Sequence, residues 1–441
     1  MSSRTEQLLS APIVPTLVRL AAPGLMLVAF QSMVSIGDTF FVGLLGTEAL
    51  AGLALVFPLV MLLQMTSAGA MGGGVSSAIS RALGAGDARR ARRLVVHALV
   101  IAAAMGTAFT VLILGLGRAI YDLLGGDEET LGYALAYSNM LFAGAVIVWV
   151  ANTLSSVLRG TGNMVVPANA LVIAAVLHVP LSASLVLGLG PMPRLGITGA
   201  GVAYIVAFAF AAALMAAVVF RPSSPLRPRR GDWLLEWSLF REILRVGALS
   251  VLSALQTVFT AVLLTGFVGR FGAAAIAGYG VGLRLELLQI PLVFAIGQAL
   301  VVLVGTNIGA GQAARARRIA WTGAGLAAWI SLLIGIAVTF FPQAWVSLFS
   351  SDPEVLASGA HYLRTVAPLY PFLAVGIALY FASQGAGNVL WPLLAGTARL
   401  AIVIAGGILV ASLEGTYVVI AMATAVYGVL TIWFVARTRW H

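Results

Sequence analysis

Phe41-Val-Gly-Leu-Leu-Gly-Thr-Glu-Ala-Leu-Ala-Gly52 reappears later in the chain as Phe267-Val-Gly-Arg-Phe-Gly-Ala-Ala-Ala-Ile-Ala-Gly278. Two shorter pairs follow at nearly the same spacing, Gly84–Asp87 with Gly309–Gln312 and Gly160–Asn163 with Gly385–Asn388. Three matches at nearly one spacing predict that the chain consists of two copies of one half. Within the first apolar segment an acidic residue is not copied, because the position that corresponds to Asp38 is Leu264.

The composition is that of an integral membrane protein. Hydrophobic residues make up 61% of the chain and charged residues 9%, whereas soluble domains carry about 25% charged residues. Cysteine is absent and only four His occur, without an HExxH motif, so disulfides and the usual zinc sites are excluded. No nucleotide-binding loop, catalytic triad or metal set is present, and we therefore expect neither an enzyme nor a bound cofactor.

Gly, Pro and charged residues divide the chain into twelve apolar segments, each long enough to cross a bilayer as a helix. The segments are 17–43, 49–75, 94–117, 131–158, 165–188, 197–220, 244–268, 273–306, 319–342, 358–383, 392–412 and 415–436. A Pro- and Arg-rich stretch with an amphipathic end, residues 221–241, predicts a cytoplasmic linker between an N-terminal lobe (1–220) and a C-terminal lobe (242–441).

Loop charges predict the orientation of the chain. The net charge of +10 comes from arginines without any lysine, and they cluster after segments two, six, eight and twelve. The opposite loops hold acids such as Asp127 and Glu354. Positive charge favours the cytoplasmic side, so both termini are expected there and no nucleic-acid role is implied. Six spans per half make the two halves parallel repeats, an arrangement of transporters that bind substrate between the halves. Duplication could also serve only to build a stable bundle or a channel.

Asp38 is the first candidate for function, because an acid inside a span costs on the order of 2.5–3.5 kcal/mol on insertion scales. Gln31, Ser35 and Asp38 follow one another at i, i+4 and i+7, which predicts one polar helix face. Burial favours the neutral form of a carboxyl group in general, so Asp38 could load and release a proton. It could instead bind Na⁺ with nearby oxygens, or act only as a structural hydrogen-bonding group.

Two further titratable residues lie within spans. His178, with Ser182 one turn later, is either a packed core histidine or the partner of Asp38 in a proton-exchanging pair. Glu286 is either a protonation or cation site of the second lobe or the partner of an arginine, and Arg284 at i−2 does not share its face. Asn152 and Gln256 lie in further polar stripes that either line a cavity or join helices.

These motifs, from Asp38-Thr-Phe-Phe to the Gly-Ala-Gly loops and Gly160-Thr-Gly-Asn163, resemble the multidrug and toxic compound extrusion (MATE) family over the whole chain. Within it the chain is most similar to the DNA-damage-inducible-protein-F-like branch. The resemblance implies an all-α membrane protein of twelve helices in two six-helix lobes forming a V. It also implies export of amphipathic, often cationic compounds in exchange for H⁺ or Na⁺, with Asp38 as the coupling residue and Asn152 near the first-lobe cavity.

The chain departs from the family at several of these positions. His178 and Ser182 stand where relatives carry Asn and Asp, and Gln256 and Gly376 stand where relatives with a second-lobe cation site carry acids. These differences favour H⁺ over Na⁺. We therefore expect a monomeric multidrug antiporter of the bacterial cytoplasmic membrane, with Asp38, His178 and Glu286 as coupling candidates. Gln31, Ser35, Asp38, Asn152, Ser182 and Gln256 are the expected cavity residues. The alternatives are a flippase for lipid-linked precursors, which needs an arginine-rich cavity, and an uncoupled channel.

Overall fold

The computed structural model describes residues 3–438 and Trp440, and of Ser3 and residues 27–31 it describes the backbone only. The described residues form helices joined by short turns, and no strand occurs among them. Ten helical stretches in this part of the chain are long and apolar enough to cross a membrane, and α6 (Glu128–Ala143) with α7 (Ala145–Gly160) form a span bent by 51°. Helix α2 (Ile13–Gly43) has 31 residues, about 45 Å at 1.5 Å per residue, which exceeds the hydrocarbon core of about 30 Å. Each of the twelve predicted spans thus corresponds to a helix or a broken helix.

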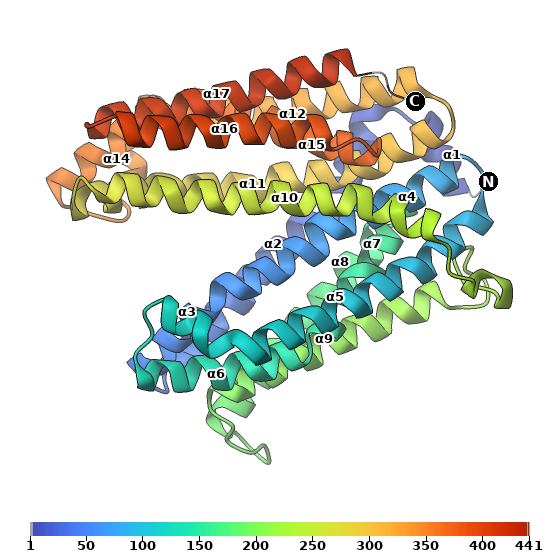
Figure 1. The fold of residues 1–441 in the computed structure, drawn as a ribbon, viewed down its shortest axis with the longest axis horizontal. Helices are drawn as coiled ribbons and strands as arrows, with labels where there is room; N and C mark the ends of the chain where they lie inside the picture. Colours follow the sequence, from blue (N-terminus) through green and yellow to red (C-terminus); the bar gives the residue numbers. More distant parts are fainter. Residues whose placement is uncertain (1–2, 439, 441) are drawn as a thin grey trace. The chain divides into compact units, whose positions relative to one another are not determined.

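The chain divides into two compact units, and the boundaries fall within α2 and α10 (Trp237–Gly269). The first unit, Ala22–Gly247, holds most of α2 and the helices from α3 to α9, coloured blue to green in Figure 1. Its further elements are α3 (Thr47–Gln64), the π-helix η1 (Met65–Met71), α4 (Gly72–Gly84), α5 (Ala88–Leu123), α6, α7, α8 (Val165–Leu187), α9 (Ile197–Val219), the 3₁₀ turn η2 (Arg230–Trp233) and the first turns of α10.

The second unit combines the N-terminal stretch up to Ala21 with the chain from Ala248 onward. Its elements are α1 (Ser3–Ser10), the start of α2, the rest of α10, α11 (Ala273–Gly309), α12 (Ala313–Phe340), α13 (Pro342–Val346), α14 (Pro353–Val366), the 3₁₀ turn η3 (Ala367–Leu369), α15 (Tyr370–Gly385), α16 (Leu390–Leu409) and α17 (Leu413–Arg437). Asn307 Nδ2 donates to the Leu8 carbonyl (3.2 Å) and Arg315 donates to that of Ala11. These contacts group the first residues with the second unit, whereas the sequence-based division placed them in a lobe of residues 1–220.

The repeated glycines occupy the same backbone conformation in both halves. Gly86 and Gly311, which follow α4 and α11, have φ values of 75° and 74°. Gly162 and Gly387, which follow α7 and α15, both have φ of 78°. A left-handed residue after a helix favours glycine because a Cβ atom would be strained there. The repeated Gly-x-Gly motifs therefore form the same helix-ending turn in both halves.

One difference between the halves lies in the second span of the first unit. The first half has one residue more between Gly46 and Gly86 than the second half has between Gly272 and Gly311. The extra residue coincides with η1, where the helix changes to the wider π pattern, while α11 runs as a continuous α-helix. A π turn takes up one additional residue without breaking the helix, and such turns are frequent at functional sites.

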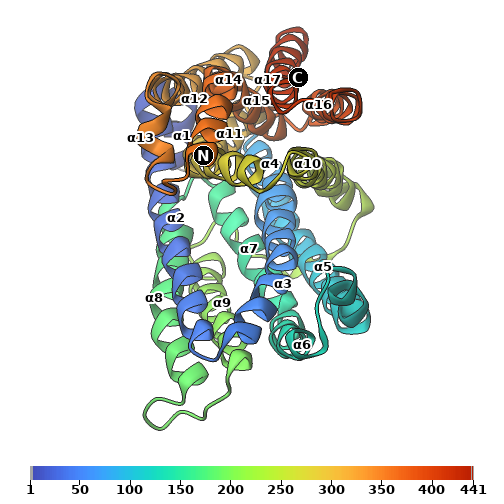
Figure 2. The same ribbon diagram turned by 90° about the vertical axis from the view of Figure 1, so that its left-hand side faces the viewer.

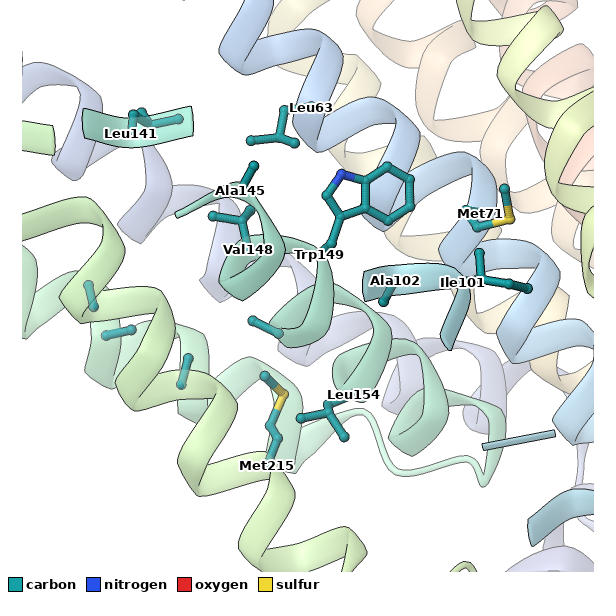
Figure 3. Close-up of a cluster of buried hydrophobic side chains, with 14 of the residues drawn as sticks. Leu63, Met71, Ile101, Ala102, Leu141, Ala145, Val148, Trp149, Leu154 and Met215 are labelled. Atoms are coloured by element: carbon teal, nitrogen blue, oxygen red, sulfur yellow. The ribbon is translucent and has the colours of Figure 1, made fainter. Parts of the chain in front are cut away.

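The core of the first unit surrounds α7. Trp149 is fully buried, and Figure 3 shows it projecting from α7 among Leu63, Ala102 and Met71. Small residues let the helices approach: a Cβ atom on Gly106 of α5 would lie 2.5 Å from the Cα of Val146 in α7. Close packing through glycine is the usual way in which membrane helices associate, because lipid offers no hydrophobic driving force between them.

The linker after α9 is tied to the arginine-rich start of α5. Arg92 Nε lies 2.8 Å from Asp232 Oδ2, and Arg93 Nη2 lies 2.7 Å from Glu236 Oε1. Glu242 at the start of α10 pairs with both Arg81 (3.1 Å) and Arg90 (2.8 Å). Arginines that the sequence suggested only as topology signals thus also hold the linker in place.

The Asp232 contact predicts that the linker loosens in acid. Burial raises the pKa of Asp232, but hydrogen bonds from the Arg229 N–H and the Arg92 guanidinium outweigh burial, so the pKa lies below its ordinary value of 3.8. A lowered pKa means that the contact stabilises the fold above the unfolded value and is lost as the pH falls through the folded value. A nitroxide on Gly231→Cys, where a side chain meets open space, reports the motion of the linker backbone, and its mobility should rise above the neutral-pH level only below about pH 4.

The matched variant is Asp232→Asn in the same labelled chain. We expect a mobile nitroxide spectrum at neutral pH, because Arg92 then lacks its charged partner. Equal spectra for the two proteins at neutral pH would show that the Asp232 contact does not hold the linker.

Candidate functional site

Asp38, His178 and Ser182 meet in the interior of the first unit. The His178 Nε2 atom lies 2.8 Å from Oδ1 and 2.9 Å from Oδ2 of Asp38. Ser182 Oγ donates a hydrogen bond of 2.7 Å to Oδ1. The three residues are 7%, 2% and 0% exposed, so the carboxyl group is buried together with its partners. The structure therefore places these three predicted site residues in a single hydrogen-bonded group.

Helices α2 and α8 position this group. Figure 2 shows α2 running beside α8, and the Asp38 hydrogen bonds cross between them. Gly37 lies beside Val179 of α8, and a Cβ atom there would be in ordinary van der Waals contact at 3.8 Å. His178 and Ser182 are one turn apart on the same face of α8, with Pro180 between them. Proline leaves one backbone carbonyl of α8 without its usual helical partner, which makes this turn more adaptable than the rest.

The two ring nitrogens of His178 have different surroundings. His178 Nδ1 is buried and has no hydrogen-bond partner in the described structure. An imidazolium would leave an N–H without an acceptor at that atom, which is costly in a buried place. The geometry therefore favours the tautomer with its hydrogen on Nε2, and this N–H donates to the Asp38 carboxyl group.

A second polar cluster lies nearby, and the sequence analysis identified only one of its members. Asn152 Nδ2 donates to Gln64 Oε1 (2.9 Å) and to Ser67 Oγ (2.8 Å). Gln64 Nε2 in turn donates to the hydroxyl of Tyr204 (2.5 Å). The Tyr204 ring meets the His178 ring edge-on, with centroids 6.1 Å apart. Asn152 is thus connected with the Asp38 group through Gln64 and Tyr204, across α3, α7 and α9.

Gln64, Ser67 and Tyr204 are functional candidates that sequence reasoning missed. Gln64 ends α3, and Ser67 lies within the π-helix η1. Polar side chains at i and i+3 in an otherwise apolar span are a signal that was available in the sequence. Tyr204 gave no such signal, because it stands alone in an apolar helix.

Ser35 and Asp38, the two described members of the predicted polar stripe of α2, differ in burial. Ser35 is exposed, and its carbonyl accepts a hydrogen bond from Thr39 Oγ1 (2.8 Å). Asp38, three residues later, is turned inward to α8. The side chain of Gln31 lies outside the described residues. Helical spacing predicted a shared face, but the packing of α2 against α8 covers only the part of that face that holds Asp38.

In the second unit, Glu286 pairs with a tyrosine. The Tyr362 hydroxyl donates to Glu286 Oε1, and Tyr279 packs edge-on against Tyr362 with centroids 5.3 Å apart. Arg284 lies instead over the Phe349 ring, 5.0 Å from its centroid. Among the described residues Glu286 forms no salt bridge, and Arg399 is an arginine that interacts with it electrostatically. Gln289, on the same helix, is 3% exposed, and neither of its amide atoms has a hydrogen-bond partner within the described part of the chain.

The two positions where acids were expected from the family have other surroundings here. Gln256 Nε2 donates to Thr397 Oγ1 (2.8 Å) at a groove of about 320 Å³ between α10 and α16. Its other lining residues are Leu252, Leu255, Phe259, Leu393, Leu394 and Leu400. A Cβ atom at Gly376 would lie 2.3 Å from the Tyr427 ring, which fills the space of a side chain. The carboxyl pair is therefore replaced by an amide and an aromatic ring.

The sequence model of the MatE family matches the chain twice, over residues 23–183 and 249–409. The matches begin at about the same spacing as the repeated glycine motifs, which confirms the duplication. A protein of Shewanella oneidensis described as an FAD transporter is 30% identical over 85% of this chain and 82% of its own length. A probable multidrug resistance protein NorM of Thermotoga maritima is 26% identical over 86% of this chain and 81% of its own length.

Solved structures show the same fold at lower sequence identity. A MOP superfamily transporter from Pyrococcus furiosus is 23% identical, with a TM-score of 0.89 over 99% of this chain and 98% of that one. A MATE structure in a bent conformation has a TM-score of 0.91 at 22% identity, over 99% and 97% of the two chains. With the family model covering both halves, the chain belongs to the MatE family, and it is a multi-pass membrane transporter rather than an enzyme.

Proposed function

We propose that this transporter exports small amphipathic, often cationic compounds in exchange for protons, and that Asp38 is the coupling residue. The observation that carries the proposal is the buried group in which Asp38 receives hydrogen bonds from His178 and Ser182. A charged carboxylate in this place attracts a cation, whereas the same group with a proton does not. One site can therefore hold either a cationic substrate or a proton.

In the proposed cycle, the deprotonated Asp38 holds the cationic group of the substrate from the inward side. A proton that enters from outside binds to the carboxyl group and neutralises it, while Ser182 keeps its hydrogen bond to Oδ1. The substrate then loses its counter-charge and leaves. The two ligands differ in their affinity for the two states of the site, which is the condition for one to drive the other.

The atoms around Asp38 support H⁺ rather than Na⁺. A sodium ion is a hard cation that takes oxygen ligands, as other hard cations do. Here the imidazole nitrogen of His178 faces both carboxyl oxygens, and Ser182 supplies one hydroxyl. An N–H donor at that place satisfies the carboxylate and competes with a metal ion. Glu286 with Tyr362 remains a second candidate for protonation.

The relatives' names leave the natural cargo open between a drug-like compound and a larger metabolite, since one is described as an FAD transporter and others as multidrug resistance proteins. The acidic site in the first unit favours a cationic or neutral cargo. A lipid-linked precursor flippase is less well supported, because Arg284 and Arg399 each lie over an aromatic ring, that of Phe349 and that of Tyr427. We place the protein in the bacterial cytoplasmic membrane as a monomer, with both termini inside.

The experiment that tests the proposal is reconstitution into vesicles with separate gradients. We expect a pH gradient alone to drive uphill movement of a fluorescent cationic dye such as ethidium, and a Na⁺ gradient at fixed pH to drive none. Dye movement under the Na⁺ gradient alone would reverse the ion assignment. Equilibration without accumulation under either gradient would instead indicate a channel.

A further inference from the structure

Four large apolar side chains stand exposed almost in a row where the linker enters α10. Trp233, Leu234, Leu235 and Trp237 are 58%, 70%, 55% and 71% exposed. Only Glu236 interrupts the run, and its carboxylate is turned to Arg93. A contiguous apolar patch of this kind on a protein surface marks an interaction site.

The backbone of this segment is fastened to α5. Arg93 Nη2 donates to the Leu234 carbonyl (3.1 Å), and the Glu236 N–H donates to His97 Nε2 (2.9 Å). His97 Nδ1 lies 2.7 Å from the Arg93 carbonyl, so the imidazole connects α5 with the linker segment. With Asp232 held by Arg92, the polar atoms of the segment face α5 and its apolar side chains face outward. Hydrogen bonds to α5 therefore hold the patch in a defined orientation.

The anchoring atoms also place the patch along the membrane normal. Arg93 and His97 lie where the charged start of α5 gives way to its apolar span from residue 94. A segment bonded to both residues lies at the level where water meets lipid. Tryptophan concentrates at this level, because its ring is apolar and its N–H is polar.

Exposed arginines beside the patch also fit a position at the boundary between water and lipid. Trp237 and Arg241 follow at i and i+4 and are both exposed, whereas Leu239 and Ile243 on the other face are buried. Arg230 is exposed on the other side of the patch. Arginine next to an apolar patch can extend its charge to lipid phosphates while its stem covers apolar surface.

We propose that residues 233–237 form an interfacial anchor that inserts Trp233, Leu234, Leu235 and Trp237 into the cytoplasmic leaflet. Arg230 and Arg241 bind the phosphates of anionic lipid headgroups beside it. The anchor fixes the linker to the bilayer surface at the point where the chain passes from one half to the other. Because the linker is also bonded to α5, it gives the first unit a fixed depth in the membrane.

The absence of cysteine from the chain makes a direct depth measurement possible. Nitroxides are attached to Leu234→Cys and Leu235→Cys in nanodiscs of phosphatidylcholine with phosphatidylglycerol. For each nitroxide we take the ratio of its collision rate with oxygen, which partitions into lipid, to its collision rate with a water-soluble nickel chelate. We expect ratios between that of Val111→Cys, an exposed position deep within the apolar span of α5, and that of Ser223→Cys in the exposed linker, and clearly distinct from the latter.

A ratio at residues 234 and 235 equal to that of Ser223→Cys would overturn the proposal and would assign the patch to a protein partner. The headgroup part is tested by Arg230→Gln with Arg241→Gln in the same labelled proteins. We expect the labels to lie deeper in anionic than in purely zwitterionic nanodiscs, and this difference to disappear in the double variant. If the difference persists there, the two arginines do not bind the headgroups. Transport activity is not the readout, so the result is independent of the coupling mechanism.

Discussion

Asp38→Asn is expected to abolish substrate-driven proton release from everted vesicles, while the protein still folds and inserts. Asparagine has nearly the shape of aspartate, so Ser182 can still donate to the side-chain oxygen that replaces Oδ1. It cannot take up a proton or carry a charge. Loss of a charge-assisted contact of about 1.5–3 kcal/mol should lower the affinity for a cationic dye by about 10–100-fold.

The experiment includes two other carboxyl variants. Asp122→Asn changes an exposed acid at the end of α5 and should leave proton release unchanged. Glu286→Gln changes the acid that pairs with Tyr362 in the second unit, and we expect proton release to continue. If proton release persists in Asp38→Asn but is lost in Glu286→Gln, the coupling residue lies in the second unit. Thermal unfolding in detergent checks that all three variants are folded.

Gly106→Ala is expected to destabilise the first unit by about 1–3 kcal/mol, the usual cost of forcing extra atoms into a packed interior. The new Cβ would lie 2.5 Å from the Val146 Cα and 3.0 Å from its nitrogen. These are backbone atoms, so α5 and α7 must move apart. Helix α7 also carries Trp149 and Asn152, and we therefore expect weaker dye binding together with a lower unfolding temperature.

Gly115→Ala is the matched control because it makes the same change in the same helix. A Cβ atom at Gly115 meets nothing within 4 Å. Replacing glycine by alanine within a helix usually stabilises by about 0.5–1 kcal/mol. The two variants should thus shift the unfolding temperature in opposite directions. If Gly106→Ala were as stable as Gly115→Ala, the contact between α5 and α7 would not be as tight as described.

The number of spans and the repeat followed directly from the sequence. Long apolar segments must form helices in a bilayer, because the backbone has no water to bind there. The turn glycines could be matched between the halves because a left-handed residue after a helix excludes most other side chains. The same reasoning missed the grouping of the first residues with the second unit, because the Asn307 and Arg315 contacts join positions far apart in the chain.

The candidate site was predictable only in part. Asp38 stood out by its cost within a span, and His178 with Ser182 by their spacing on one helix. Ser35 was assigned to the same face as Asp38, yet it is exposed. In a helix that is apolar nearly all round, periodicity cannot show which part of a face is covered by a neighbour.

The sequence by itself determined the membrane class, the two copies of a six-helix half and the intramembrane acid Asp38 that the second copy lacks, because these depend on composition and on local backbone rules. Tertiary structure decided the partners of that acid. Asp38 meets His178 and Ser182 through the packing of α2 on α8, and Tyr204 and Gln64 connect them to Asn152. Hydrogen bonds between separate helices depend on how those helices rotate and pack, and no local pattern in one apolar helix specifies that.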